Sequence, residues 1–270
     1  METILPVDRQ GSGPGPGSFL EDMKRYWDEH PIGIEPFDEP IGSPQFYEKY
    51  LAYYDRFYDY KWVAFDYNKY RGLKVLEIGC GLGVDSVKFA KAGADLTCID
   101  LSDTSVACTR NLLDGLGLKA TVQQGDAEHL SFPDNSFDAV YAYGVLMLVE
   151  NEARAYAELR RVLKVGGEAL VVLYHRRSWY WLLSRLSGTK VESYLGDPGT
   201  NRVHSLDEVG ELFKSFSRIE ITLDRFPRQT KRRRGVAAFL FNWIFVPLAS
   251  LIPRFVMRPF GWHIIVKAIK

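Results

Sequence analysis

A glycine-rich turn directly after a short apolar run most constrains how this chain can fold. Residues 73–86 read LKVLEIGCGLGVDS, so an apolar stretch ends beside an acid and is followed by three alternating glycines. Small residues at such a turn let the backbone approach a bound ligand closely. A strand, a glycine turn and a helix in this order predict an open α/β sheet that binds a nucleotide-like ligand.

The chain after this turn alternates short apolar runs with helical patterns. The patterns predict strands at residues 73–79, 95–100, 120–124, 137–143, 168–175, 218–224 and 262–269, and helices at 84–92, 102–116, 150–163 and 206–216. Ser102 and Ser205 are favourable N-cap residues, and the KVGG sequence at 164–167 is expected to end a helix. Strands separated by helices predict a mostly parallel sheet that is covered on both faces.

The spacing of the glycines distinguishes between two kinds of ligand. A dinucleotide fingerprint needs G-x-G-x-x-G, and its third glycine would fall on Val84. A pyrophosphate also disfavours carboxylates near its helix, whereas a partly cationic amino-acid ligand with a sulfonium accepts Glu77 and Asp85. An NAD oxidoreductase is therefore disfavoured. Asp100, at the end of the second strand, can accept from two ribose hydroxyls, which indicates an adenosine ligand without choosing between the two kinds.

The segment after the third predicted strand favours adenine recognition. Residues 125–138 read GDAEHLSFPDNSFD. Asp126 is placed to accept from an exocyclic amine, and the backbone amide of Ala127 can serve a ring nitrogen.

The motifs VLEIGCGLG, CIDLS, GDAEHLSFPDNSFDAVYAYGVL and ELRRVLKVGGEALVVLYH together resemble the class I S-adenosylmethionine-dependent methyltransferases. The group is often labelled type 11 or ubiquinone-biosynthesis-like, and the resemblance covers about residues 73–175. It implies a Rossmann-like α/β fold with a seven-stranded, mostly parallel sheet in the order 3-2-1-4-5-7-6, strand 7 being antiparallel. It also implies S-adenosyl-L-methionine as the cofactor and S-adenosyl-L-homocysteine as its product.

The resemblance also implies roles for individual residues. At the methionine end of the cofactor, Gly79, Gly81 and Gly83 would line the site, and Glu77 would contact the methionine or orient the loop. Tyr143 would pass near the sulfonium. At the adenosine end, Asp100 would hold the ribose and Leu101 would pack beside the adenine. Asp126 and Ala127 would hold the adenine ring.

The expected reaction is an in-line displacement, because a sulfonium already makes its methyl group reactive. The protein then aligns a nucleophile and excludes water, and acid or base help depends on the nucleophile. His175 and the adjacent Tyr174, at the end of the fifth strand, are the catalytic candidates, and His175 is a candidate base. The alternative is a structural histidine bonded to the backbone. Arg202 and His204, in the loop before the helix at 206, are candidates for contact with the substrate.

We expect five regions along the chain. They are a flexible N-terminus at 1–18, a helical lid or cap at 19–72, a methyltransferase core at 73–226, a basic and apolar insertion at 227–260, and a last core strand at 261–270. The aromatic stretch 46–70 is expected to pack on the edge of the sheet and also to cover the ligand pocket.

The insertion joins a basic cluster at 228–234 to an apolar run at 236–252. A membrane span is disfavoured, because the run is short and because a span would separate the last strand from its partners in the sheet. Two alternatives remain open. The insertion lies on an anionic membrane surface, or it is a hydrophobic lid over an apolar substrate pocket.

The composition excludes several functional classes. Thirty-four basic and 34 acidic residues balance, so a broad electrostatic grip on nucleic acid is not expected. The three cysteines lack metal-site spacing, and their odd number argues against a disulfide framework and for a reducing cytoplasm. The N-terminus does not have the pattern of a signal peptide. We expect a cytoplasmic protein without a metal site, peripheral on the inner face of the membrane.

The predicted function is methylation of a small, lipophilic acceptor such as a prenylated, polyketide or other secondary metabolite. Many relatives carry a histidine pair after strand four, and Met147 and Leu148 stand here instead, which makes the pocket more apolar. One alternative is a methyltransferase of a polar sugar or amine, in which the insertion serves for dimerisation. Another is a non-catalytic partner protein that binds S-adenosylmethionine. The acceptor atom and the oligomeric state are left open.

Overall fold

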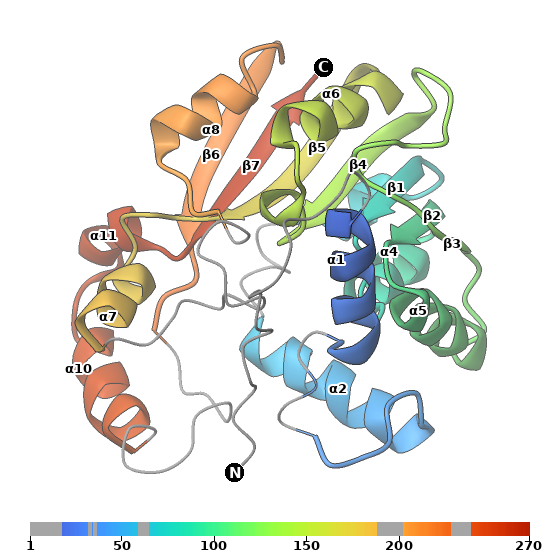
Figure 1. Cartoon of the computed structure of the whole chain (residues 1–270). Coiled ribbons are helices and arrows are strands. Elements are labelled where there is room, and N and C mark those ends of the chain that lie inside the picture. The colour runs from blue at the N-terminus through green and yellow to red at the C-terminus, as the bar shows by residue number, and fades with distance from the viewer. Residues whose placement is uncertain (1–17, 32–33, 35–36, 59–64, 188–201, 228–238) are drawn as a thin grey trace.

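One seven-stranded sheet forms the centre of the protein (Figure 1). The computed structural model describes residues 18–31, 34, 37–58, 65–187, 202–227 and 239–270. The strand order is β3-β2-β1-β4-β5-β7-β6, with β7 antiparallel to both β5 and β6 and the other pairs parallel. The predicted order and the antiparallel last strand are therefore confirmed. The strands are β1 (Lys74–Ile78), β2 (Asp95–Asp100), β3 (Thr121–Gln124), β4 (Phe137–Tyr143), β5 (Leu163–Tyr174), β6 (Arg218–Asp224) and β7 (His263–Ile269).

Helices cover both faces of the sheet. The helical elements are α1 (Ser18–Glu29), α2 (Pro44–Phe57), η1 (Tyr67–Tyr70), α4 (Val84–Ala92), α5 (Asp103–Gly115), η2 (Leu146–Leu148), α6 (Glu152–Val162), α7 (Trp179–Ser187), α8 (Leu206–Leu212), η3 (Leu240–Phe245), α10 (Val246–Ser250), α11 (Arg254–Met257) and η4 (Arg258–Phe260).

The two faces of the sheet belong to two separate apolar clusters. Successive side chains of a strand point to opposite faces, so Tyr141 of β4 packs in the cluster of α2, η1, α4 and α5, while Val140 packs with α6 and α8. Both residues are almost fully buried. Because both faces are covered, the central strands β1 and β4 are mostly buried and read as apolar runs, which is the pattern that predicted them.

Most helix boundaries follow local capping chemistry. The Ser102 hydroxyl accepts from the Ser105 amide at the start of α5, and Ser205 forms a capping box with Glu208 at the start of α8. Both N-caps were predicted. Gly93 ends α4 with a left-handed φ of 88°.

Strand β5 begins earlier than its sequence pattern predicts. We expected a helix to residue 163, the KVGG stop, and a strand from 168, whereas α6 ends at Val162 and β5 starts at Leu163. Leu163 pairs with Phe137 of β4, and the register shifts before the next pair. Gly166 adopts a φ of 79° at this irregularity. The two glycines therefore form a bulge inside an extended strand, where the helical pattern alone predicted a turn.

The aromatic stretch after residue 46 packs into the core. Along α2, the Phe46 and Tyr50 rings lie 5.1 Å apart, and the Tyr50 and Tyr54 rings lie 4.7 Å apart. Phe65 meets Tyr141 of the sheet edge to face at 5.4 Å. The described residues of the stretch thus cover one face of the sheet, whereas the prediction placed them on its edge.

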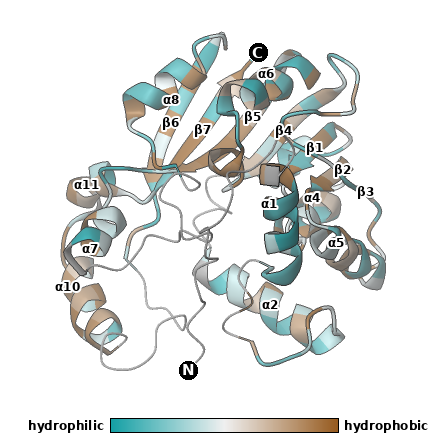
Figure 2. Ribbon diagram, in the orientation of Figure 1, coloured by the Kyte–Doolittle hydropathy of each residue, from teal (hydrophilic) through white to brown (hydrophobic). Residues whose placement is uncertain are grey.

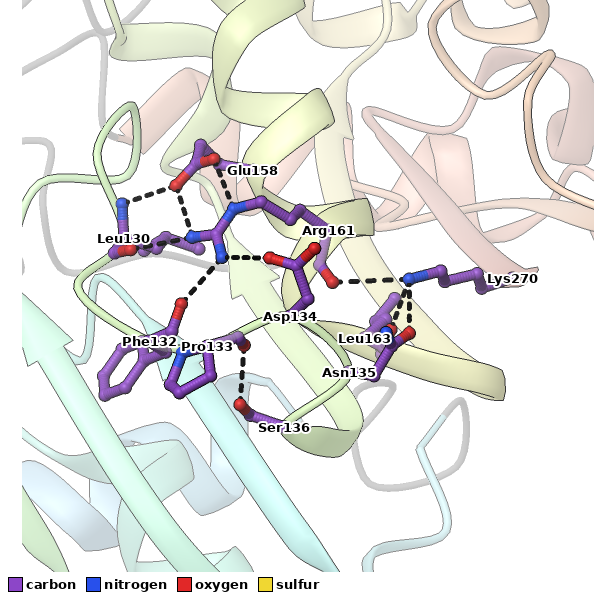
Figure 3. Close-up of polar contacts among 10 residues, drawn as sticks. All are labelled: Leu130, Phe132, Pro133, Asp134, Asn135, Ser136, Glu158, Arg161, Leu163 and Lys270. Carbon is purple, nitrogen blue, oxygen red and sulfur yellow. Dashed lines mark hydrogen bonds and ion pairs between the residues drawn. The ribbon is translucent and has the colours of Figure 1, made fainter.

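Arg161 holds the loop between β3 and β4 against α6 (Figure 3). Its guanidinium donates to the carbonyl oxygens of Leu130 at 2.8 Å and Phe132 at 2.7 Å. It also pairs with Glu158 at 2.7 Å and Asp134 at 2.8 Å. One planar cation therefore joins four groups, and it fixes the loop that follows the adenine-binding candidates.

Candidate functional site

A cleft of about 140 Å³ lies at the carboxyl ends of β1 to β4. In open α/β sheets, ligands bind at this edge because the loops there diverge to opposite faces. Seven of the predicted cofactor residues line the cleft: Gly79, Gly81, Asp100, Leu101, Asp126, Ala127 and Tyr143. The other lining residues are Phe19, Leu20, Met23, Trp27, Ile78, Ser105, Gly125, Glu128, Gly144, Val145, Leu148 and Val149.

Gly79 occupies a backbone position that no other residue fits. Its φ is 73°, and a Cβ there would lie 2.1 Å from Cγ2 of Val145. A side chain would collide with the opposite wall of the cleft and would also strain the backbone. The Val145 side chain already occupies the space beside Gly79, so only glycine lets the turn pack against it.

Asp100 joins the glycine turn to the start of α5. Its two carboxylate oxygens accept from the Gly81 amide at 2.8 Å and the Ser102 amide at 3.0 Å. Burial raises the pKa of the Asp100 carboxyl above its usual value, although these amides oppose the shift. Each oxygen has a second lone pair, so the carboxylate can still accept from two hydroxyl groups of a ligand.

Asp126 is held in a turn by its own neighbours. Its carboxylate accepts from the Glu128 amide at 2.9 Å and contacts Nδ1 of His129 at 2.8 Å. Ala127 is buried beside it, and its small side chain packs with the apolar cluster on the α6 face. The turn orients both residues at the end of β3, where the sequence analysis places adenine recognition.

Helix α1 closes the cleft. Phe19, Leu20, Met23 and Trp27 line it from this one helix. Asp28 fixes α1 to the start of α5, because its carboxylate accepts from the Ser102 hydroxyl at 2.8 Å and the Thr104 amide at 3.1 Å.

The lid was assigned to residues 19–72 as a whole, and of the described residues from 46 to 70 none lines the cleft. The sequence analysis did not single out the α1 residues. Their apolar spacing of four and eight positions in SFLEDMKRYWDE was the available signal.

A chain of polar contacts leads from the cleft to the far strands. Tyr143, at the end of β4, contacts Nδ1 of buried His263 through its hydroxyl at 3.2 Å, and Nε2 of His263 lies 2.7 Å from the Arg225 guanidinium. A guanidinium has only donors, so Nε2 accepts and the proton of the neutral ring sits on Nδ1, which donates to the Tyr143 oxygen. Hydrogen bonds are therefore donated in one direction along this series, from Arg225 to His263 and from His263 to Tyr143.

The sequence analysis missed Arg225 and His263. They meet because Asp224 of β6 pairs with His263 of β7, although 38 positions separate His263 from Arg225. No local pattern marks such a contact.

Glu77 and Gly83 shape the glycine turn without lining the cleft. Glu77 is 2% exposed and accepts from the Ser86 hydroxyl at 2.5 Å, which ties β1 to α4. Gly83 caps α4 with a φ of 84°, and a Cβ there would lie 3.1 Å from the Thr109 hydroxyl. Of the two roles considered for Glu77, this geometry corresponds to orienting the loop.

Tyr174 and His175 lie behind the cleft wall. The Tyr174 ring stacks on Trp262 at 4.5 Å, and its hydroxyl faces Gly144. His175 is 3% exposed, and its Nδ1 lies 3.1 Å from the Gly261 carbonyl oxygen, so it donates there. Burial lowers the pKa of His175 below its usual value, which keeps the ring neutral. This geometry is that of the structural alternative, and neither residue lines the cleft.

Arg202 and His204 also do not line the cleft. Arg202 donates to the carbonyl oxygens of Val149 and Glu150. His204 is buried and lies 2.9 Å from the Glu152 carboxylate. The two residues therefore join the loop before α8 to the start of α6, and the structure does not bring them to the cofactor candidates.

The described part of the chain holds no group of histidine, cysteine and acidic residues suited to a metal ion. All three cysteines are free and buried. Among the described helices, none combines the length and the apolar character that crossing a bilayer requires.

Comparison with known proteins identifies relatives of the core. Residues 76–171 match a family model described as a methyltransferase domain. A sterol 24-C-methyltransferase of Gibberella zeae is 35% identical over 136 residues, which are 49% of this chain and 32% of that protein. A ubiquinone/menaquinone biosynthesis C-methyltransferase of Bordetella avium is 36% identical over 121 residues, 43% of this chain and 47% of that protein. The chain spans 26% to 53% of the length of the first curated relatives that it matches.

A solved structure extends the likeness of the fold beyond the core. Magnesium protoporphyrin IX methyltransferase of Synechocystis PCC 6803 aligns with a TM-score of 0.58 at 16% identity. The alignment covers 93% of this chain and 99% of that one. At this identity the likeness concerns the fold alone.

Proposed function

From the methyltransferase-domain match over residues 76–171 and the cleft that it surrounds, we propose that the chain is a class I S-adenosylmethionine-dependent methyltransferase that transfers a methyl group to a small, lipophilic acceptor. The observation that carries the proposal is the cleft at the carboxyl ends of β1 to β4. It collects seven residues that the sequence motifs assign to one cofactor. The cofactor is S-adenosyl-L-methionine, and the product that leaves is S-adenosyl-L-homocysteine.

The residues of the cleft suit the parts of this cofactor. Gly79 and Gly81 leave the backbone bare for the methionine end. Asp100 offers carboxylate lone pairs to the ribose hydroxyls, and Asp126 and Ala127 take the adenine. The sulfonium supplies an activated methyl group. The fit rests on the two glycines that line the cleft and on the acceptor chemistry of the two acids.

The chain's own contribution to catalysis is alignment and exclusion of water. Helix α1 places four apolar side chains over the cleft, which lowers the local water content around the reacting atoms. Tyr143 holds a fixed position at the cleft because His263 donates to its hydroxyl. In-line displacement needs a nucleophile oriented toward the methyl group, and these walls orient it. The proposal assigns no proton transfer to Tyr174 or His175.

A lipophilic acceptor is supported by the apolar wall of the cleft and by the relatives. Val145, Leu148 and Val149 line the cleft together with the apolar α1 side chains. Two relatives are named for sterol and quinone substrates. We place the acceptor among prenylated, polyketide or similar secondary metabolites, and the protein in the cytoplasm at the inner face of the membrane. A polar sugar or amine acceptor is the alternative enzyme function, and a non-catalytic protein that binds the cofactor is the alternative outside catalysis.

Native mass spectrometry of the purified protein tests the cofactor first. We expect an added mass equal to S-adenosylmethionine or S-adenosylhomocysteine. If the protein carries no cofactor, it is titrated with S-adenosylhomocysteine and NADH in competition. Binding of NADH alone would overturn the proposal. Incubation with methyl-labelled S-adenosylmethionine and lipid extracts should label an extractable product. Cofactor binding without labelling of lipid, sugar or amine acceptors would favour the non-catalytic alternative.

A further inference from the structure

The segment from Phe239 to Phe260 carries most of the large apolar side chains that the described protein exposes. Ten of its eighteen exposed large hydrophobic residues fall within these positions. The ten are Phe239, Leu240, Trp243, Ile244, Leu248, Leu251, Ile252, Phe255, Val256 and Phe260. We call these ten residues the apolar face. Figure 2 shows the brown ribbon of α10 standing apart from the sheet. Patches of this kind mark interaction sites in soluble proteins.

The apolar face rests on a built support. Phe241 is buried, and its ring stacks with Trp179 of α7 at 6.3 Å. Trp179 also lies 6.1 Å from the Phe245 ring, and its indole NH donates to the Arg225 carbonyl at 2.8 Å. Inward-facing aromatics thus hold the segment on α7 while the apolar face points outward. The segment is therefore anchored on α7, and the apolar face is the side that this packing leaves exposed.

The stretch of sequence that carries the apolar face has charges of one sign. No aspartate or glutamate occurs after Asp224, whereas eight arginines and lysines occur between Arg225 and Arg258. The chain as a whole is balanced at 34 basic and 34 acidic residues, so this stretch departs from the rest. Among the described members, Arg258 is exposed and adjoins Phe255 and Phe260. An apolar surface in a basic stretch of sequence, with Arg258 exposed within it, matches the acyl chains and anionic headgroups of a bilayer.

The apolar face is separate from the cleft. No described residue from 239 to 260 lines the cleft, and α1 closes it instead. The described part of the insertion therefore does not cover this cleft, where a lid over the substrate pocket would be expected. Of the two alternatives left by the sequence, the geometry points to the membrane.

We propose that the apolar face docks on the surface of an anionic lipid bilayer, with Trp243 and Phe255 entering the acyl boundary and the arginines meeting the headgroups. The proposal deepens the proposed function, since a lipophilic acceptor partitions into the same bilayer. Lipid binding is nevertheless measured without any methyl transfer. Failure of one proposal is therefore distinguishable from failure of the other.

The test is co-sedimentation of the full chain with vesicles of phosphatidylcholine, with and without phosphatidylglycerol. We expect binding to the anionic vesicles that weakens at high salt, and a partition coefficient lowered more than about tenfold in a Trp243→Ser/Phe255→Ser double variant. The matched control is Val165→Ser, because Val165 is 85% exposed in the β5 bulge and lies outside the apolar face. The control should bind as the wild type does.

Two further measurements keep the proposal falsifiable. Brominated lipids should quench the fluorescence of the wild type, and Trp243→Phe should lose most of that quenching while it still binds. Unfolding curves must show that the double serine variant is folded. Equal vesicle binding by wild type and the double variant would overturn the proposal. A wild-type dimer in sedimentation velocity that the double variant abolishes, without vesicle binding by either, would assign the apolar face to a second copy of the chain.

Discussion

Replacing Asp100 by alanine tests the proposed ribose site at its most specific contact. The carboxylate accepts from the Gly81 and Ser102 amides at 2.8 and 3.0 Å, and its remaining lone pairs face the cleft that it lines. A hydrogen bond to a charged group contributes about 1.5–3 kcal/mol. Loss of one such bond corresponds to a dissociation constant for S-adenosylhomocysteine that is about 10- to 150-fold higher.

Isothermal titration calorimetry with S-adenosylhomocysteine measures this loss directly. Asp95→Ala is the matched control, because Asp95 begins the same strand at its opposite, exposed end. The control should bind with the wild-type affinity. Wild-type affinity in Asp100→Ala would refute the ribose assignment, and an equal loss in both variants would show that the effect comes from the strand and not from the contact.

The same residue predicts a pH dependence of cofactor binding. Burial raises the pKa of the Asp100 carboxyl, so it takes up a proton at a higher pH than an ordinary aspartate does. The protonated group loses its charge and part of its capacity to accept hydrogen bonds. Affinity for S-adenosylhomocysteine should therefore fall as the pH decreases through this raised pKa. Asp100→Asn should lack that part of the profile, and an identical profile in both proteins would contradict the reasoning.

Three further predictions concern stability. Gly79→Ala should lower the free energy of unfolding in urea by about 2–4 kcal/mol, because alanine is strained at this positive φ and its Cβ overlaps Val145. Gly210→Ala is the control: the added Cβ would meet no atom within 4 Å in α8, so this variant should be more stable by about 0.5–1 kcal/mol. Arg161→Ala should cost about 1–3 kcal/mol and Arg160→Ala, which loses one exposed hydrogen bond, no more than about 0.5 kcal/mol; similar losses would contradict the bridging role. The folded pKa of His175 lies below its unfolded value, so the unfolded state binds the proton first and stability should fall as the pH decreases below about 6.5, down to the folded pKa. His175→Gln should flatten that decline in thermal unfolding, and an unchanged decline would exclude His175 as its source.

The candidate cofactor site was largely predictable because its residues sit at strand ends within short motifs. The alternation of strand and helix orders the carboxyl ends along one edge, so Asp100 and Asp126 had to approach the same edge. The glycines at 79 and 81 lie at the end of the first of these strands. Seven of the nine expected cofactor residues line the cleft for this reason. Glu77 and Gly83 do not, because strand alternation and a helix cap turn them toward the interior.

Candidates outside these motifs were not predictable in the same way. His175 ends a strand at the same edge, but its side chain turns to the Gly261 carbonyl and away from the cleft. Arg202 and His204 pack against the start of α6. The direction of a loop side chain depends on which element packs beside the loop, and local sequence patterns do not identify that element.

The sequence by itself determined the strands, the glycine turn and the acids at the strand ends, because each depends on local periodicity or on a residue's own conformational range. The order of the strands in the sheet was implied by the resemblance to the class I methyltransferases. Only the tertiary structure decided what closes the cleft, how Arg225 and His263 reach Tyr143, and which side of the 239–260 segment is exposed. These features depend on contacts between elements far apart in the chain. Such contacts form through packing and burial, and the free energy of packing is set by the neighbours that the fold supplies.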